Sequence, residues 1–114
     1  MTGIRHVALK ARSMEATERF YVDVLGFRVP FRMEGMLFLE TPGGNDMLTF
    51  EPARGRLNPK GGGFDHFGLH VPKAAWRKLQ GRLKRKGVRI TGRRGRAAIF
   101  IRDPSGYAIE LYRD

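Results

Sequence analysis

The chain has 114 residues, of which 41% are hydrophobic and 29% charged, and its formal net charge is +11. Its length fits one domain, and no apolar run approaches the roughly 20 residues of a membrane span. Because cysteine is absent, disulfides and thiolate metal sites are excluded, so any metal would need nitrogen and oxygen ligands. The N-terminus lacks a signal-peptide core, and we therefore expect a cytoplasmic protein.

The first half of the chain predicts a strand, a helix and three further strands. A strand over residues 4–11 precedes Ser13, a typical helix N-cap, and apolar residues then recur with helical spacing as far as Leu25. Gly26 is expected to end this helix in a left-handed conformation. Three strands are then expected, over residues 27–31, 36–40 and 46–50.

The second half repeats this order after a connection rich in glycine, proline and arginine. A strand is expected over residues 64–71, followed by a helix that Pro72 opens and Gly87 ends. Three more strands are expected, over residues 88–91, 97–102 and 107–112.

The two halves also align residue by residue. His6 matches His66 at an offset of 60, Gly26 matches Gly87 at 61, and Phe38 matches Phe100 at 62. Each half is too small for a stable core of its own, so the halves need a packing partner. We therefore predict a single α+β domain over residues 1–114. It contains two tandem βαβββ modules, 1–51 and 64–114, joined by a linker over 52–63.

Three residues form a candidate metal site. Glu110 interrupts the apolar run of the last expected strand, where an unpartnered carboxylate would be costly to bury. His6 and His66 hold repeat-related positions, whereas Leu48, the repeat mate of Glu110 at an offset of 62, cannot bind metal. We predict that His6, His66 and Glu110 hold one divalent ion (Fe, Mn, Zn or Ni) with open coordination positions. The alternatives are ordinary hydrogen-bonded histidines and an ion pair between Glu110 and an arginine.

Five other residues are candidates for substrate binding. Strand alternation predicts that Leu48, Phe50 and Tyr112 face the concave side of the sheets. Arg94 and Arg96 lie in an expected loop, where they could clamp an anionic group, although an exposed basic hairpin explains them equally well. No nucleophile or general base stands out, so no catalytic residue is assigned.

The excess positive charge is concentrated between Arg77 and Arg102. Much of it decorates one helix, which is typical of a solvated helix surface. No helix-turn-helix, zinc-finger or aromatic RNA-binding signature accompanies it. Nucleic-acid binding is therefore the minor alternative.

The whole chain resembles the vicinal oxygen chelate superfamily, which includes glyoxalase I, fosfomycin resistance proteins, extradiol dioxygenases, methylmalonyl-CoA epimerase and bleomycin resistance proteins. The resemblance rests on His6, on the helix end over residues 20–27, on the strand at His66, and on residues 103–107 leading to Glu110. It implies sheets curved into a cup with helices on the outer face and a metal between the modules. It also implies a homodimer, in which His6 acts with the His66 and Glu110 of either its own or the other subunit.

The resemblance implies two functions. One is a metal-dependent lyase, isomerase, thiol transferase or dioxygenase, in which the ion chelates the vicinal oxygens of a small substrate and stabilises an oxyanion. The other is a ligand-sequestering protein of the bleomycin-resistance type, without chemistry. Glyoxalase I has a fourth protein ligand where this chain has Leu48, so the ligand set is nearer to that of fosfomycin resistance proteins and extradiol dioxygenases. The three-ligand set leads us to expect an enzyme.

Overall fold

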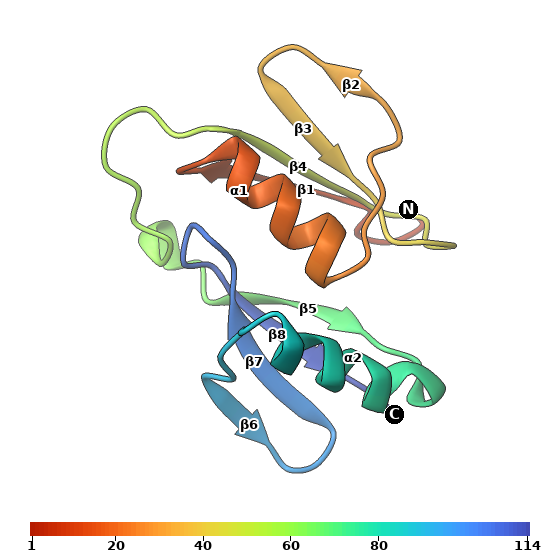
Figure 1. Cartoon of the computed structure of the whole chain (residues 1–114). Coiled ribbons are helices and arrows are strands. Elements are labelled where there is room, and N and C mark those ends of the chain that lie inside the picture. The colour runs from red at the N-terminus through yellow and green to blue at the C-terminus, as the bar shows by residue number, and fades with distance from the viewer. The chain divides into compact units, whose positions relative to one another are not determined.

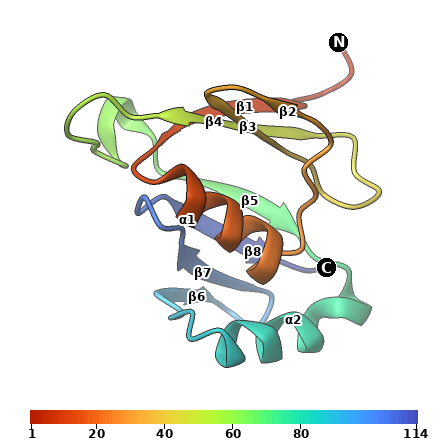
Figure 2. The same cartoon turned by 45° about the horizontal axis from the view of Figure 1, so that its top comes forward.

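The computed structural model describes all 114 residues and divides into two compact units, Met1–Leu57 and Asn58–Asp114 (Figure 1). Each unit contains a four-stranded mixed sheet with a helix over one face (Figure 2). The expected α+β class with paired βαβββ modules is therefore confirmed. None of the helices has the length and apolar character needed to cross a bilayer.

Unit 1, Met1–Leu57, follows the expected order. Its elements are β1 (His6–Ala11), α1 (Met14–Arg19), the π-helical turn η1 (Phe20–Val24), β2 (Arg32–Met33), β3 (Met36–Leu39) and β4 (Met47–Pro52). The sheet order is β1-β4-β3-β2, with β1 parallel to β4 and the other pairs antiparallel. As expected, Ser13 caps α1, because its Oγ accepts a hydrogen bond from the backbone N–H of Ala16 (3.1 Å).

The expected strand over residues 27–31 is wrong. This stretch forms only an isolated bridge between Arg28 and Glu40, and regular pairing begins at Arg32. Pro30 interrupts the stretch and has no N–H to donate to a ladder, which explains the late start of β2.

Unit 2, Asn58–Asp114, repeats the topology. Its elements are the short 3-10 turn η2 (Gly61–Gly63), β5 (His66–His70), α2 (Lys73–Arg85), β6 (Gly92–Arg94), β7 (Ala98–Arg102) and β8 (Ala108–Tyr112). The sheet order is β5-β8-β7-β6, with β5 parallel to β8.

The expected strand over residues 88–91 is also wrong, because that stretch closes the end of α2. The N–H of Val88 donates to the carbonyl of Leu83 (2.9 Å), and Gly87 has φ +70°, as in a Schellman cap. Pairing of β6 with β7 starts only at Gly92.

The strand registers give the equivalent residues of the two units. Ala8 pairs with Thr49 as Gly68 pairs with Glu110. Phe38, the mate of Phe100, likewise lies opposite Thr49. The counterpart of Glu110 is therefore Thr49, and the alignment of Glu110 with Leu48 was wrong by one residue. In a strand, a shift of one residue moves a side chain to the other face.

The core of unit 1 lies between its sheet and its helical segment. Phe50 is fully buried, and its ring lies 5.3 Å from that of Tyr21 in η1. Leu48 is also buried and shares the face of Phe50 by alternation. The prediction that Leu48 and Phe50 face the concave side is therefore wrong, because both lie on the helix-covered face.

The core of unit 2 has the same plan. Side chains from α2 and from the helix-facing side of the sheet are fully or nearly fully buried: Leu79, Leu83, Ile99, Ile101, Ile109 and Leu111. The opposite face of β8 carries Ala108, Glu110 and Tyr112, so the candidate residues of unit 2 lie on the face without the helix.

Candidate functional site

Three strands bring polar side chains together on the helix-free face of unit 2. Glu110 on β8 lies between Gly68 on β5 and Phe100 on β7 in the ladder. A Cβ atom at Gly68 would lie 3.2 Å from the Tyr112 ring and 3.7 Å from Glu110 Oε1. Because Gly68 has no side chain, the Tyr112 ring packs closely over β5 beside the Glu110 carboxylate.

His66, at the start of β5, is held between two carboxylates. Its Nδ1 donates to Asp65 Oδ2 (2.5 Å), and its Nε2 lies 3.4 Å from Glu110 Oε1. The ring stands edge-on to Phe100, with centroids 5.5 Å apart. The hydrogen bond that His66 donates to Asp65 raises the pKa of His66 above its ordinary value. Partial burial opposes this shift, and the charges of Asp65 and Glu110 add to it.

Glu110 is 8% exposed, and its carboxylate has an arginine as a second neighbour. Arg94 donates to Oε2 of Glu110 through Nε (3.1 Å) and also through Nη2. The Arg94 side chain is otherwise 68% exposed. The ion pair between Glu110 and an arginine, which the sequence left open as an alternative, is therefore present, and Arg94 belongs to strand β6 rather than to a loop.

Unit 1 holds a different pair at the same register. Nε2 of His6 is hydrogen-bonded to Oγ1 of Thr49 (2.9 Å), and Thr49 is buried. The neutral hydroxyl of Thr49 thus takes the place that the Glu110 carboxylate takes beside His66.

The remaining candidates lie near the edges of unit 2. Tyr112 is partly exposed, and its ring lies 5.4 Å from that of His70, whose Nε2 is 3.1 Å from Asp114 Oδ1. Arg96 is exposed in the turn between β6 and β7. Sequence reasoning missed Asp65, although a carboxylate directly before a candidate histidine ligand was a readable signal.

Within each unit, no group of three or more His, Cys, Asp or Glu side chains is placed to hold a metal. Unit 2 does supply two donors, His66 Nε2 and Glu110 Oε1, 3.4 Å apart on one face. Asp65 holds the other ring nitrogen of His66, as carboxylates commonly do for metal-bound histidines. These residues fit a divalent ion in donor type, whereas the Arg94 cation competes for Glu110. His6 belongs to the other unit, so the triad stays a prediction.

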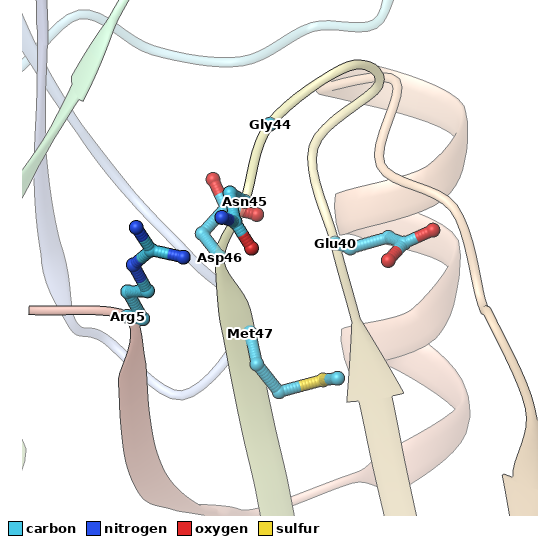
Figure 3. A pocket seen from close by; sticks show the side chains of 6 residues that line it. All are labelled: Arg5, Glu40, Gly44, Asn45, Asp46 and Met47. Carbon is cyan, nitrogen blue, oxygen red and sulfur yellow. The ribbon is translucent and has the colours of Figure 1, made fainter. Parts of the chain in front are cut away.

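Unit 1 also contains an open pocket of about 250 Å³ at the end of its sheet (Figure 3). It is lined by Arg5, Glu40, Gly44, Asn45, Asp46 and Met47. Both of its carboxylates have partners, because Asp46 accepts from Thr41 and Glu40 pairs with Arg28. None of the predicted site residues lines it.

Comparison with known proteins agrees with this architecture. An integron cassette protein from the mobile metagenome of the Halifax Harbour sewage outfall is 24% identical over 100% of both chains, with a TM-score of 0.82. A glyoxalase/dioxygenase from Nostoc punctiforme is 17% identical over 99% of this chain and 91% of that chain (TM-score 0.81). An antibiotic-binding protein from a Streptomyces species is 20% identical over 99% and 96% (TM-score 0.76). At these identities the likeness establishes the fold.

Sequence comparison supplies the family. A search of curated proteins returned no match. The family model described as the glyoxalase/bleomycin resistance protein/dioxygenase superfamily matches residues 3–111. Together with the paired βαβββ modules, this match over nearly the whole chain shows that the protein belongs to the glyoxalase/bleomycin resistance protein/dioxygenase superfamily, that is, to the vicinal oxygen chelate proteins.

Proposed function

We propose that this protein is a metal-dependent enzyme that acts on a small molecule with adjacent oxygen atoms. His66 and Glu110 would supply two protein ligands of the ion, and His6 the third. The observation that supports this is the chain of contacts from Asp65 through His66 to Glu110. A bound divalent ion would supply Lewis-acid chemistry, by polarising the substrate oxygens and stabilising negative charge on them.

Each side chain of unit 2 has a defined role in this proposal. Asp65 accepts the Nδ1–H of His66, which fixes the tautomer and leaves Nε2 as the ligating atom. Glu110 offers Oε1 beside that nitrogen, while Arg94 binds Oε2. Arg94 neutralises the buried carboxylate in the metal-free protein and competes with the ion for its charge.

The direct test is the metal content of purified variants. His66→Ala, Glu110→Gln and His6→Ala are each expected to reduce bound metal to background in elemental analysis. The matched control is His70→Ala, because His70 lies on the same strand and the same face but pairs with Asp114. Metal retained in full by the Glu110→Gln variant would contradict the proposal.

The proposal includes a homodimer in which His6 completes the site of the other subunit. Mixing His6→Ala protein with Glu110→Gln protein tests this directly. Sharing between subunits predicts that an equimolar, fully exchanged mixture regains about a quarter of the wild-type sites, because half of its dimers are mixed and one of the two sites in a mixed dimer has all three ligands. Ligands from a single subunit predict no recovery. Sedimentation at the same concentrations gives the oligomeric state.

A second candidate function is sequestration of a ligand without chemistry. The observation that favours it is the Arg94 ion pair, which already neutralises Glu110 and needs no metal. This candidate predicts that protein stripped with a chelator binds its small molecule as tightly as untreated protein does. Calorimetry on both preparations, with oxygen-rich antibiotics and with 1,2-dicarbonyl or catechol compounds, separates the two functions.

A further inference from the structure

The positive charge of this protein belongs almost entirely to unit 2. Residues 58–114 contain 14 of the 22 basic residues but only four of the 11 acidic ones, whereas residues 1–57 contain eight basic and seven acidic residues. The charge excess is therefore a property of one unit rather than of the whole surface.

All four acidic side chains of unit 2 bind partners outside α2. Asp65 binds His66, Glu110 binds Arg94, and Asp114 binds His70. Asp103 is buried and accepts two backbone N–H groups of its own turn. The segment 73–89 has no acidic residue and contains eight cations, none of which forms an ion pair: Lys73, Arg77, Lys78, Arg82, Lys84, Arg85, Lys86 and Arg89.

The cations of α2 line both edges of its solvent face. At 100° per residue, Lys73, Arg77 and Lys84 form one row and Lys78 and Arg85 another, with Ala74 and Gly81 between the rows. All five cations are exposed, while Leu79 and Leu83 are buried. Figure 2 shows that α2 lies over one face of the unit 2 sheet. The helix thus presents two parallel rows of charge separated by a low ridge.

The solvated helix surface expected from the sequence does not account for the absence of acidic residues from α2. Such surfaces usually mix charges, because opposite charges four residues apart stabilise a helix and like charges destabilise it. In α2, Lys73 and Arg77 are a like-charge pair at this spacing, as are Lys78 and Arg82. The clustering of like charges therefore destabilises the helix, and a bound polyanion would reduce the repulsion between these charges.

Unit 1 provides an internal contrast. The arginine on the helix-facing side of its edge strand, Arg32, binds Glu18 of α1 through two hydrogen bonds (2.9 and 2.8 Å). The equivalent arginine of unit 2 is Arg93, which has the same place in the register. Because α2 has no carboxylate, Arg93 remains unpaired and extends the cationic surface.

We infer that the exposed face of α2, with Arg93 beside it, binds the phosphate backbone of a nucleic acid without reading its sequence. Binding that comes from cations alone, without groups that read base edges, is the signature of backbone contact. An amphipathic helix that inserts into a membrane surface carries exposed apolar residues, and the centre of a protein interface usually carries an aromatic anchor. The large exposed apolar side chains are Met1, Ile4, Phe31, Met33 and Tyr112, all outside α2.

Fluorescence anisotropy with a labelled DNA duplex of arbitrary sequence tests this inference on the intact protein. If three to four cations contact phosphates, the logarithm of the affinity falls with the logarithm of salt concentration with a slope of about −3. The same measurement with an RNA duplex shows whether the site prefers one backbone. No binding even at about 50 mM salt, where such contacts are strongest, would overturn the inference.

A matched pair of triple variants locates the surface. Lys73→Glu, Arg77→Glu and Lys78→Glu change the N-terminal half of α2, where acidic residues favour the helix dipole, so the helix should persist by circular dichroism. The control changes three exposed arginines of unit 1 to glutamate: Arg5, Arg54 and Arg56. Both variants shift the net charge equally, but only the α2 variant should weaken duplex binding, by about 100-fold.

Three further results decide the inference. Equal loss in both variants would show a net-charge effect and overturn it. Tighter binding to phosphatidylserine vesicles than to duplex, with the same dependence on α2, would replace the nucleic acid with a membrane. The metal content of the α2 variant should match that of wild type, so the inference and the proposed metal site can fail separately.

Discussion

The two units share one register and differ in a few side chains on the helix-free face. His6 meets the Thr49 hydroxyl in unit 1, while His66 meets the Glu110 carboxylate in unit 2. At the edge strand, Met33 of unit 1 takes the place of Arg94 of unit 2. The backbone ladder therefore positions a histidine and a partner twice, and side-chain identity alone decides which unit has a charged site.

The largest expected effect comes from exchanging the partners. Glu110→Thr gives unit 2 the residue of unit 1 and should weaken metal binding by more than about 100-fold. It removes a ligand and its charge, which is a greater loss than that of a residue that only hydrogen-bonds to a ligand. Thr49→Glu copies unit 2 into unit 1 and should leave the metal bound at Glu110 in place. Calorimetric titration with Zn²⁺ or Mn²⁺ measures both. Unchanged affinity in Glu110→Thr would show that the units do not differ in function at this register.

The loops that precede β4 and β8 give the second contrast. Asp103 is buried and accepts from the N–H groups of Ser105 (2.9 Å) and Tyr107 (3.0 Å). Asp46 accepts from Thr41 through its N–H (2.9 Å) and hydroxyl (2.6 Å), but it is exposed. Asp103→Ala should cost about 3 kcal/mol, since two buried donors lose their partner, whereas Asp46→Ala should cost less than about 1 kcal/mol. Urea unfolding measures both, and equal costs would contradict the difference in burial.

The sequence predicts the helices of this fold better than it predicts the register of strand pairing. Periodicity, Ser13, Gly26 and Gly87 predict both helices and their ends, because caps and glycine conformations are local properties. The sequence alignment cannot fix strand pairing, because the two halves differ in loop length and the offset drifts from 60 to 62. A one-residue slip in that alignment placed Leu48 on the wrong face.

The candidate site was predictable only in part. The sequence grouped His6, His66 and Glu110 in one site, and unit 2 brings two of these residues, His66 and Glu110, to 3.4 Å from each other. Hydrophobic periodicity does not show which polar side chains contact each other. It therefore did not predict that Asp65 binds His66 or that Arg94 of β6 binds Glu110. Edge strands are hard to locate from sequence because they are short, as the misplacement of β6 illustrates.

A smaller effect is expected at Asp65, whose counterpart in unit 1 is Arg5. Asp65→Asn should lower the pKa of His66 towards its ordinary value, because the main stabilising partner of the imidazolium is lost. In wild type the raised pKa means that this interaction stabilises the fold below the ordinary pKa and is lost as pH rises through the raised one. NMR titration of metal-free protein measures the shift. Metal affinity should fall about 10-fold, and an unchanged pKa would contradict the assigned role of Asp65.

The smallest effect is expected at Arg94, where Arg94→Met copies Met33 of unit 1. Because the Arg94 side chain is largely exposed, its ion pair with Glu110 is worth at most about 1 kcal/mol. Removing a cation that competes for the carboxylate should therefore tighten metal binding by only about threefold to fivefold. Arg96→Met is the matched control, since Arg96 lies two residues away in the exposed turn and should leave the affinity unchanged. Weaker binding in Arg94→Met alone would mean that Arg94 positions Glu110 for the ion rather than competing with it, and the two units would then differ by a supporting residue as well as by a ligand.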